Sequence, residues 1–344
     1  MDAIEALERI AYLLERGRQP TYRVRAFRKA AATLSELPVG EVEQRATTGR
    51  LRDLAGVGET TEKVILEALA GETPSYLVHL ESEAAGDEPL SEEATALLEA
   101  LRGDCHTHSD WSDGGSPIPE MAAAARDLGH EWVALTDHSP RLTVAKGLSP
   151  ERLRRQLDVV AALNAEMAPF RILTGIEVDI LDDGSLDQEE ELLARLDLVV
   201  ASVHSKLRMD RKAMTQRMVV AVANPHVDVL GHCTGRLVAG RAGGRSGSRG
   251  RPESEFDAEL VFAGCAKFAT AVEVNSRPER LDPPKRLLRM AIEMGCYLAV
   301  DTDAHAPGQL EWQPYGCERA ADCGADPGRV INTWSAEELL AWTG

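Results

Sequence analysis

Apolar residues recur at helical spacing through the first eighty residues of the chain. They repeat every three or four positions over residues 2–16 and again over residues 21–34, which predicts two amphipathic helices. Residues 51–65 have the sequence LRDLAGVGETTEKVI, in which Gly56 and Gly58 permit a tight turn between two helical stretches. We therefore expect a small all-α domain over residues 1–80.

From residue 101 onwards, short apolar runs alternate with helical periods. Helices are predicted near residues 116–129, 151–166, 211–223 and 283–295. Seven β-α units with right-handed crossovers predict an α/β fold, a closed parallel barrel over residues 101–344. The seven predicted strands lie in the segments LRGDCH, WVALTDH, ILTGIEVDI, LDLVVASVH, VDVLGH, AVEVNS and YLAVDTDAH.

The segment between these two regions, residues 81–100, carries seven acidic side chains and no basic one. Gly86 and Pro89 interrupt helical structure, and a short helix is predicted after Ser91. We interpret this segment as an acidic linker. Twenty residues are too few to form a further domain.

Composition narrows the classes of protein to consider. The net charge of −18 argues against a general nucleic-acid binder, but residues 16–29 carry six basic side chains without an acid, and residues 235–251 carry five arginines without an acid. These stretches are either phosphate-binding patches or ordinary solvated faces. No apolar run approaches the ~18 residues of a membrane span. The six cysteines form no C-x-x-C pair, which favours reduced thiols and a cytoplasmic location.

Nearly every predicted strand ends in a residue type that binds metals, and six of the nine histidines occupy such positions. In a β/α barrel the carboxyl ends of the strands meet at one mouth, so these side chains are expected to form a common metal site. Two neighbours are less clear from sequence: Asp137 could orient a histidine, and Glu273 could face the mouth or simply end its strand. The expected ligand types are His106 and His108, His138, Glu177, His204, His232, Asp303 and His305, with Asp113 on the loop after the first strand.

The N-terminal segments TYRVRAFRKAAATL and LAGVGETTEKVI resemble the helix-hairpin-helix domain of family X DNA polymerases. The resemblance implies that this domain grips a nucleic-acid backbone, and it leaves a docking domain that binds nothing as the alternative. Where that family has a lysine that reacts with abasic sugars, this chain has Val64, so lyase chemistry is not expected. The predicted DNA-binding residues are Gly56, Gly58, Arg23, Arg25, Arg28 and Lys29.

The motifs HTH…D, TDH, GIE, HS, GH and TDAH in residues 102–344 resemble those of the polymerase and histidinol phosphatase (PHP) family. That resemblance implies a distorted seven-stranded β/α barrel with three divalent ions, Zn²⁺ or Mn²⁺ and possibly Fe²⁺. It assigns His106, His108, Glu177 and Asp303 to a first ion. It assigns Asp113, His138 and His305 to a second, and Glu177, His204 and His232 to a third.

Such a cluster implies hydrolysis of phosphate esters, with Asp113, His138 and Arg236 predicted as catalytic residues. The leading hypothesis is a phosphoesterase acting on DNA, as a 3′-5′ exonuclease or in the processing of ends or abasic sites during repair. Template-directed synthesis is excluded because only the acidic linker stands where a polymerase core would lie. The alternatives are a small-molecule phosphatase of the histidinol-phosphate type and a non-catalytic DNA-binding accessory protein.

Overall fold

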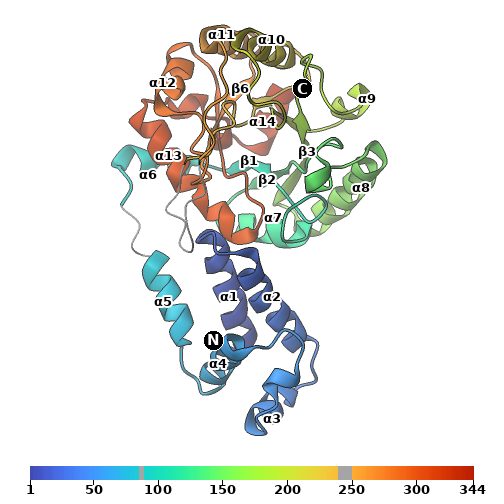
Figure 1. Cartoon of the computed structure of the whole chain (residues 1–344), viewed down its shortest axis with the longest axis vertical. Helices are drawn as coiled ribbons and strands as arrows, with labels where there is room; N and C mark the ends of the chain where they lie inside the picture. The colour runs from blue at the N-terminus through green and yellow to red at the C-terminus, as the bar shows by residue number, and fades with distance from the viewer. Residues whose placement is uncertain (85–88, 239–249) are drawn as a thin grey trace. The chain divides into compact units, whose positions relative to one another are not determined.

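The computed structural model of the chain describes residues 1–84, 89–238 and 250–344 (Figure 1). These residues divide into two compact units, the first ending at Pro89 and the second beginning at Leu90. No helix in the described ranges is both long and apolar enough to cross a membrane. Each unit has its own hydrophobic core, as the change in sequence pattern near residue 101 predicts.

The first unit is entirely helical, and both long predicted helices are confirmed. Its helices pack around a core to which Leu7, Ile10, Leu14, Phe27 and Ile65 contribute. The first helix begins with a capping box, in which Asp2 and Glu5 each accept a hydrogen bond from the other's backbone N–H. The helices are α1 (Ala3–Arg16), α2 (Thr21–Ser35), α3 (Glu41–Thr47), α4 (Glu59–Leu69) and α5 (Ser75–Ala84), with a 3-10 turn η1 (Leu51–Asp53).

The turn between η1 and α4 contains Gly56 and Gly58, as predicted. Gly56 has a φ of +82°, and a Cβ on it would lie 2.7 Å from the Lys29 side chain. Gly58 is the N-cap of α4, and its N–H donates to the Thr61 hydroxyl at 2.8 Å. The hairpin therefore needs glycine at position 56 for its conformation and for the close approach of α2.

The second unit is a nearly closed barrel of seven parallel strands in sequential order, as predicted. A bridge between Thr107 and Ala304 brings the first and last strands together. The side chains of successive strand residues are almost all buried, which explains their continuous apolar runs in the sequence. The strands are β1 (Gly103–Thr107), β2 (Trp132–Leu135), β3 (Arg171–Asp179), β4 (Leu198–Ser202), β5 (Val229–Leu230), β6 (Ala271–Asn275) and β7 (Leu298–Asp301).

Helices cover the outside of the barrel. The four that the sequence predicts are α7 (Ile118–Asp127), α8 (Pro150–Met167), α10 (Arg211–Val222) and α12 (Lys285–Glu293). The others are α6 (Glu92–Ala100), α9 (Glu190–Leu193), α11 (Ala258–Phe268), α13 (Gln313–Asp322) and α14 (Ala336–Thr343).

Helix α6 belongs to the barrel unit rather than to a linker. It packs against α13, and the backbone N–H and hydroxyl of Ser91 both donate to Glu318 Oε2, at 2.9 and 3.1 Å. The short helix after Ser91 is therefore confirmed, but its apolar residues Ala94 and Leu97 join the core of the barrel. The acidic stretch that separates the units ends before Leu90.

A single buried asparagine, Asn332, crosslinks the strands on either side of the barrel seam. Its amide nitrogen donates to Gly103 O at 3.2 Å and to Asp301 Oδ1 at 2.9 Å, and its amide oxygen accepts from Val300 N at 2.6 Å. These bonds join β1 to β7 through one side chain that has no solvent exposure. Loss of the side chain would leave several buried polar groups without partners.

We therefore expect Asn332→Ala to destabilise the barrel by about 2 to 4 kcal/mol, measured by denaturant unfolding. Asn164 provides a comparison, because it also bridges a backbone, donating to Ile172 O at 2.8 Å and accepting from Ile172 N at 2.7 Å, but is only half-buried. Asn164→Ala should cost about 1 kcal/mol. Equal losses in the two variants would contradict the special role given to Asn332.

Candidate metal centre

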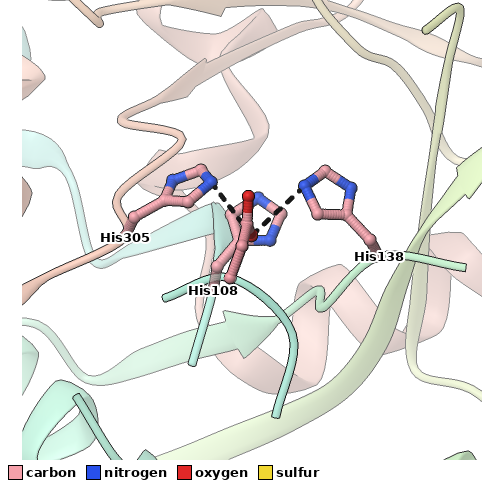
Figure 2. A group of neighbouring side chains, drawn as sticks. His108, His138 and His305 are labelled. Carbon is pink, nitrogen blue, oxygen red and sulfur yellow. Dashed lines mark ion pairs between the residues drawn. The ribbon is translucent and has the colours of Figure 1, made fainter. Parts of the chain in front are cut away.

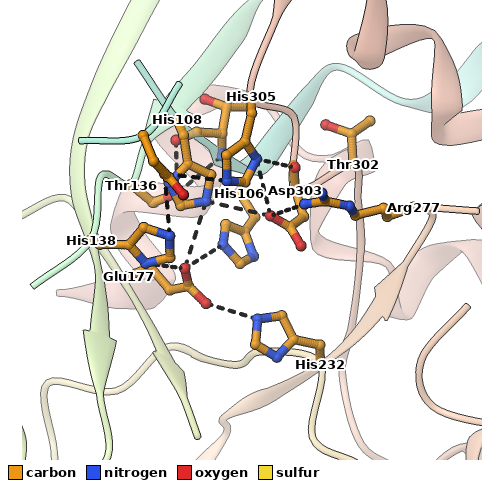
Figure 3. Close-up of polar contacts among 12 residues, drawn as sticks. His106, His108, Thr136, His138, Glu177, His232, Arg277, Thr302, Asp303 and His305 are labelled. Atoms are coloured by element: carbon orange, nitrogen blue, oxygen red, sulfur yellow. Dashed lines mark hydrogen bonds and ion pairs between the residues drawn. The ribbon is translucent and has the colours of Figure 1, made fainter. Parts of the chain in front are cut away.

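The nine predicted ligands converge at the carboxyl ends of the strands. Figure 3 labels all of them except Asp113 and His204. Two of them, His106 and Glu177, lie within β1 and β3, and the others lie on the loops that follow β1, β2, β4, β5 and β7. His106 and His108 have no exposed surface, and Glu177 is 1% exposed. The barrel topology thus gathers side chains that are up to 199 positions apart, from His106 to His305, into one buried site.

The Glu177 carboxylate is the centre of the cluster. Its Oε2 lies 2.8 Å from His138 Nδ1 and 3.3 Å from His106 Nε2. Its Oε1 lies 2.9 Å from His232 Nε2 and 3.1 Å from His204 Nε2. One carboxylate therefore contacts imidazoles that come from four different strand ends.

A second group forms around Asp113, whose Oδ1 lies 3.4 Å from His138 Nε2 and 3.3 Å from His305 Nε2. His108 completes this group, in which one ligand atom from each residue lies within 4.8 Å of the others. Figure 2 shows the three histidines arranged around the carboxylate. The group contains the second ligand set that the family resemblance implies, with His108 added.

The remaining groups also follow the implied sets. His106, His108 and Asp303 form one group, with His108 Nε2 3.5 Å from Asp303 Oδ1. His138, Glu177 and His204 form another, and His232 joins them through Glu177. His108 and His138 each take part in two groups, so each of these histidines connects two neighbouring groups. The assignment of each residue to one ion stays a prediction.

Several buried ligand atoms at this site have no hydrogen-bond partner among the described residues. They are His106 Nε2, both ring nitrogens of His108, His138 Nδ1, His204 Nε2, His232 Nδ1 and Glu177 Oε2. Some of them lie within ion-pair distance of one another without forming a hydrogen bond. Buried polar atoms in a native protein are normally paired, and a cluster of unpaired ones requires an explanation. Imidazole nitrogens and carboxylate oxygens that face one another in this way are the donor set of divalent transition metals, so the residues fit such ions.

Comparison with known proteins agrees with this geometry. Residues 1–74 match the family described as helix-hairpin-helix domain, and residues 104–253 match the family described as PHP domain. A probable phosphatase of Thermoanaerobacter sp. (strain X514) is 30% identical over 213 residues, which cover 59% of this chain and 78% of that protein. The chain belongs to the PHP family.

Two further relatives differ in length and similarity. The DNA polymerase/3′-5′ exonuclease PolX of Bacillus subtilis (strain 168) is 40% identical over 245 residues, which cover 71% of this chain but 41% of that protein. The chain thus spans less than half the length of this relative. The crystal structure of histidinol phosphate phosphatase from Lactococcus lactis, complexed with zinc, L-histidinol and phosphate, is 16% identical with a TM-score of 0.46. That match covers 66% of this chain and 95% of the phosphatase.

Electrostatics within the PHP site favour ionised carboxylates. Burial alone would raise the pKa of Glu177, but the surrounding imidazoles of His204 and His106 outweigh burial and hold that pKa well below its ordinary value. Burial would lower the pKa of His204, but Glu177 and Asp179 raise it to about 9. Burial and the neighbouring His305 and His138 rings lower the pKa of His108. Carboxylates that stay charged in a buried site are suited to hold cations.

A second layer of carboxylates orients the ligands of the PHP site. Glu273 Oε1 lies 2.5 Å from His106 Nδ1, and its Oε2 accepts from the His232 backbone N–H at 2.5 Å. Asp179 Oδ1 lies 3.1 Å from His204 Nδ1. Of the two alternatives left by the sequence, Glu273 therefore faces the mouth, where it contacts His106. Its contact with Nδ1 leaves Nε2 of His106 to bind an ion.

Asp137 does not orient a histidine, contrary to the expectation from its position. Its carboxylate accepts hydrogen bonds from the Ser109 hydroxyl at 2.6 Å, the Ser112 hydroxyl at 2.5 Å and the Gln156 amide at 2.6 Å. The two serines belong to the loop that leads to Asp113. Asp137 therefore holds the loop that carries a ligand, an effect that spacing along the chain could not show.

Three arginines, Arg236, Arg277 and Arg280, lie on the loops that follow β5 and β6, and the catalytic role of Arg236 stays a prediction. Arg236, predicted to be catalytic, donates from Nε to Arg280 O at 3.0 Å and from Nη2 to Leu281 O. Arg280 donates from Nε to Asp303 Oδ2 at 3.0 Å, and Arg277 lies close to the same carboxylate. Sequence reasoning missed both of these residues, although each follows the end of β6 as the ligands follow other strands.

The predicted DNA-binding residues of the first unit have varied surroundings. Arg28 is paired with Glu15 through two contacts, at 2.8 and 3.0 Å. Arg23 donates to Gln19 at 2.9 Å, and Arg25 is exposed. Val64, at the expected lysine position, is 1% exposed and belongs to the core. The DNA-binding assignment stays a prediction.

We expect Glu177→Gln to reduce the number of metal ions per chain, because the amide removes the negative charge that lies among four imidazoles. Elemental analysis of the purified protein measures this number directly. Glu191→Gln, at an exposed position in the short helix α9, serves as the control. Unchanged metal content in Glu177→Gln would contradict the central position of this carboxylate.

Glu273→Gln tests whether the Glu273 carboxylate orients the His106 ring. The substitution keeps the shape of the side chain but weakens its hold on His106 Nδ1, so metal affinity should fall by about 10- to 100-fold. Competition with a chelating dye measures the affinity. The exposed Glu293→Gln on α12 should leave it unchanged. An affinity in Glu273→Gln equal to that of the wild type would show that this contact does not orient the ligand.

Proposed function

We propose that the PHP domain of this chain is a metal-dependent phosphoesterase that acts on DNA, as a 3′-5′ exonuclease or in the processing of DNA ends or abasic sites. The observation that carries the proposal is the buried set of mutually facing, unpaired ligand atoms around Glu177. The helix-hairpin-helix domain at residues 1–74 supports a nucleic-acid substrate. The similarity to the Bacillus subtilis polymerase and exonuclease supports the same substrate class.

The exposure of the ligands indicates where a phosphate would arrive. The side chain of Asp113 is 36% exposed and that of His305 is 18% exposed, whereas those of His106 and His108 are fully buried. The substrate would therefore meet the site on the side of Asp113 and His305. This side also contains His138, which like Asp113 is predicted to be catalytic.

The residues of the chain prepare the site for hydrolysis. Divalent ions bound there would lower the pKa of a water molecule and offset the negative charge of the phosphoryl group. Asp137 fixes the loop that presents Asp113, and Glu273 and Asp179 fix the rings of His106 and His204. These contacts keep the donor atoms in place before substrate binds, which limits the reorganisation required during the reaction.

Two alternatives remain as outcomes of the test. The probable phosphatases at 30% identity, of which this chain covers 78%, favour a small-molecule phosphatase whose first domain has a docking role. A non-catalytic DNA-binding protein would not need nine competent ligands, so the intact cluster weighs against it.

The decisive assay is Mn²⁺-dependent release of nucleotides from a 3′-labelled duplex. His106→Ala should abolish it, because this ring lies between the Glu177 and Glu273 carboxylates. Gly58→Val should raise the KM for DNA about tenfold or more while hydrolysis of p-nitrophenyl phosphate stays unchanged. A Cβ at Gly58 meets no described atom within 4 Å, so there is open space at this position for a side chain that would keep a phosphate backbone away.

Ala70→Val at the other end of α4 is the matched control and should bind DNA as the wild type does. Hydrolysis confined to small monoesters, equal in the wild type and Gly58→Val, would support the small-molecule alternative. Absence of hydrolysis on every phosphoester and with every divalent metal would support the accessory protein.

A further inference from the structure

The Arg277 guanidinium lies beside the candidate metal centre and is only loosely paired. Its Nη1 lies 3.5 Å from Asp303 Oδ1, and its Nε lies 3.6 Å from Glu279 Oε2 (Figure 3). Both distances exceed those of a normal N–H···O hydrogen bond. Within the described part of the chain, the side chain is held by these two ion pairs and no hydrogen bond, and 27% of it is exposed.

The neighbouring arginines differ in this respect. Arg280 donates a hydrogen bond to Asp303 Oδ2 at 3.0 Å, and 14% of its side chain is exposed. Arg236 is 17% exposed and donates to two backbone carbonyls, those of Arg280 and Leu281. These contacts hold the loop after β6 and the Asp303 carboxylate in place. Among the three, Arg277 has the most donors left for another partner.

The backbone of Arg277 is nevertheless firmly placed. Its N–H donates to Asn275 Oδ1 at 3.1 Å, and the Asn275 amide nitrogen donates to Glu273 Oε2 at 3.2 Å and to Asp303 Oδ2 at 3.3 Å. Arg277 is thus anchored to the carboxylates around the ligands, while the end of its side chain is only loosely paired. An anchored backbone that carries a side chain with free donors is suited to binding a ligand rather than to stabilising the fold.

We propose that Arg277 binds the phosphoryl oxygens of the substrate, an inference that rests on the proposed phosphoesterase function. The guanidinium is planar and presents donors in a fork that can bind two oxygens of one phosphate. Asp303 is one of the residues that would hold a metal ion, and a bound cation would weaken its attraction for Arg277. The guanidinium, still near Glu279 at 3.6 Å, would then have donors available for a phosphate oxygen. Arg277 is in this account a substrate-binding residue, and Arg280 is a positioning residue for Asp303.

Titration of the metal-loaded protein with inorganic phosphate, followed by calorimetry, tests the assignment without relying on turnover. Arg277→Ala should bind phosphate about 10- to 100-fold more weakly than the wild type, because it loses charge-assisted hydrogen bonds. Arg277→Lys should fall between the two, since it keeps the charge but not the fork. Metal content, measured on the same samples, should be unchanged in both variants.

Arg211→Ala is the matched control, an arginine that is 64% exposed and paired with Asp257, and it should bind phosphate as the wild type does. Phosphate affinity in Arg277→Ala equal to that of the wild type would overturn the proposal, as would loss of metal in both Arg277 variants or no measurable phosphate binding by the wild type. If the wild type binds phosphate but does not degrade DNA, the proposed DNA substrate fails while the role of Arg277 is still decided by the titration.

Discussion

The buried carboxylate of Glu177 is the constraint on which the barrel and its site depend. A charged group with 1% exposure is strongly unfavourable unless it is paired, and here it is surrounded by imidazoles rather than by lysine or arginine. Those imidazoles come from the ends of different strands, so they surround the carboxylate only when the strands lie in their sequential parallel order. The strand order of the barrel therefore assembles the site.

The same constraint explains why the barrel carries so many secondary contacts. A ring that must present one nitrogen to an ion has to be held through the other, and Glu273 and Asp179 do this for His106 and His204. Asp137 acts one step further away, on the loop that carries Asp113. Asn332 then joins the two strands at the seam, next to the residues that lead into the site. These surrounding residues give the predicted metal ligands a defined geometry before any ion binds.

The order of strands and the position of the ligands could be predicted from the sequence for a simple reason. Buried parallel strands appear as continuous apolar runs, and their carboxyl ends meet at one mouth, so ligand types at those ends must lie close together. The roles of Glu273 and Asp137 could not be predicted, because they depend on which way a side chain points at the end of a strand. Arg277 was missed because no predicted metal ligand lies shortly before it in the sequence, as His232 does before Arg236, and only the distance to Asp303 reveals it. Helix α6 was assigned to a linker from its acidity, whereas its apolar face places it in the barrel core.

The central claim is that the residues around Glu177 bind divalent ions, and anomalous X-ray scattering from crystals grown with Mn²⁺ or Zn²⁺ tests it most directly. The account predicts anomalous peaks within coordination distance of Glu177, with further peaks beside Asp113 and Asp303. Peaks elsewhere in the molecule, together with none among these carboxylates and histidines, would contradict it.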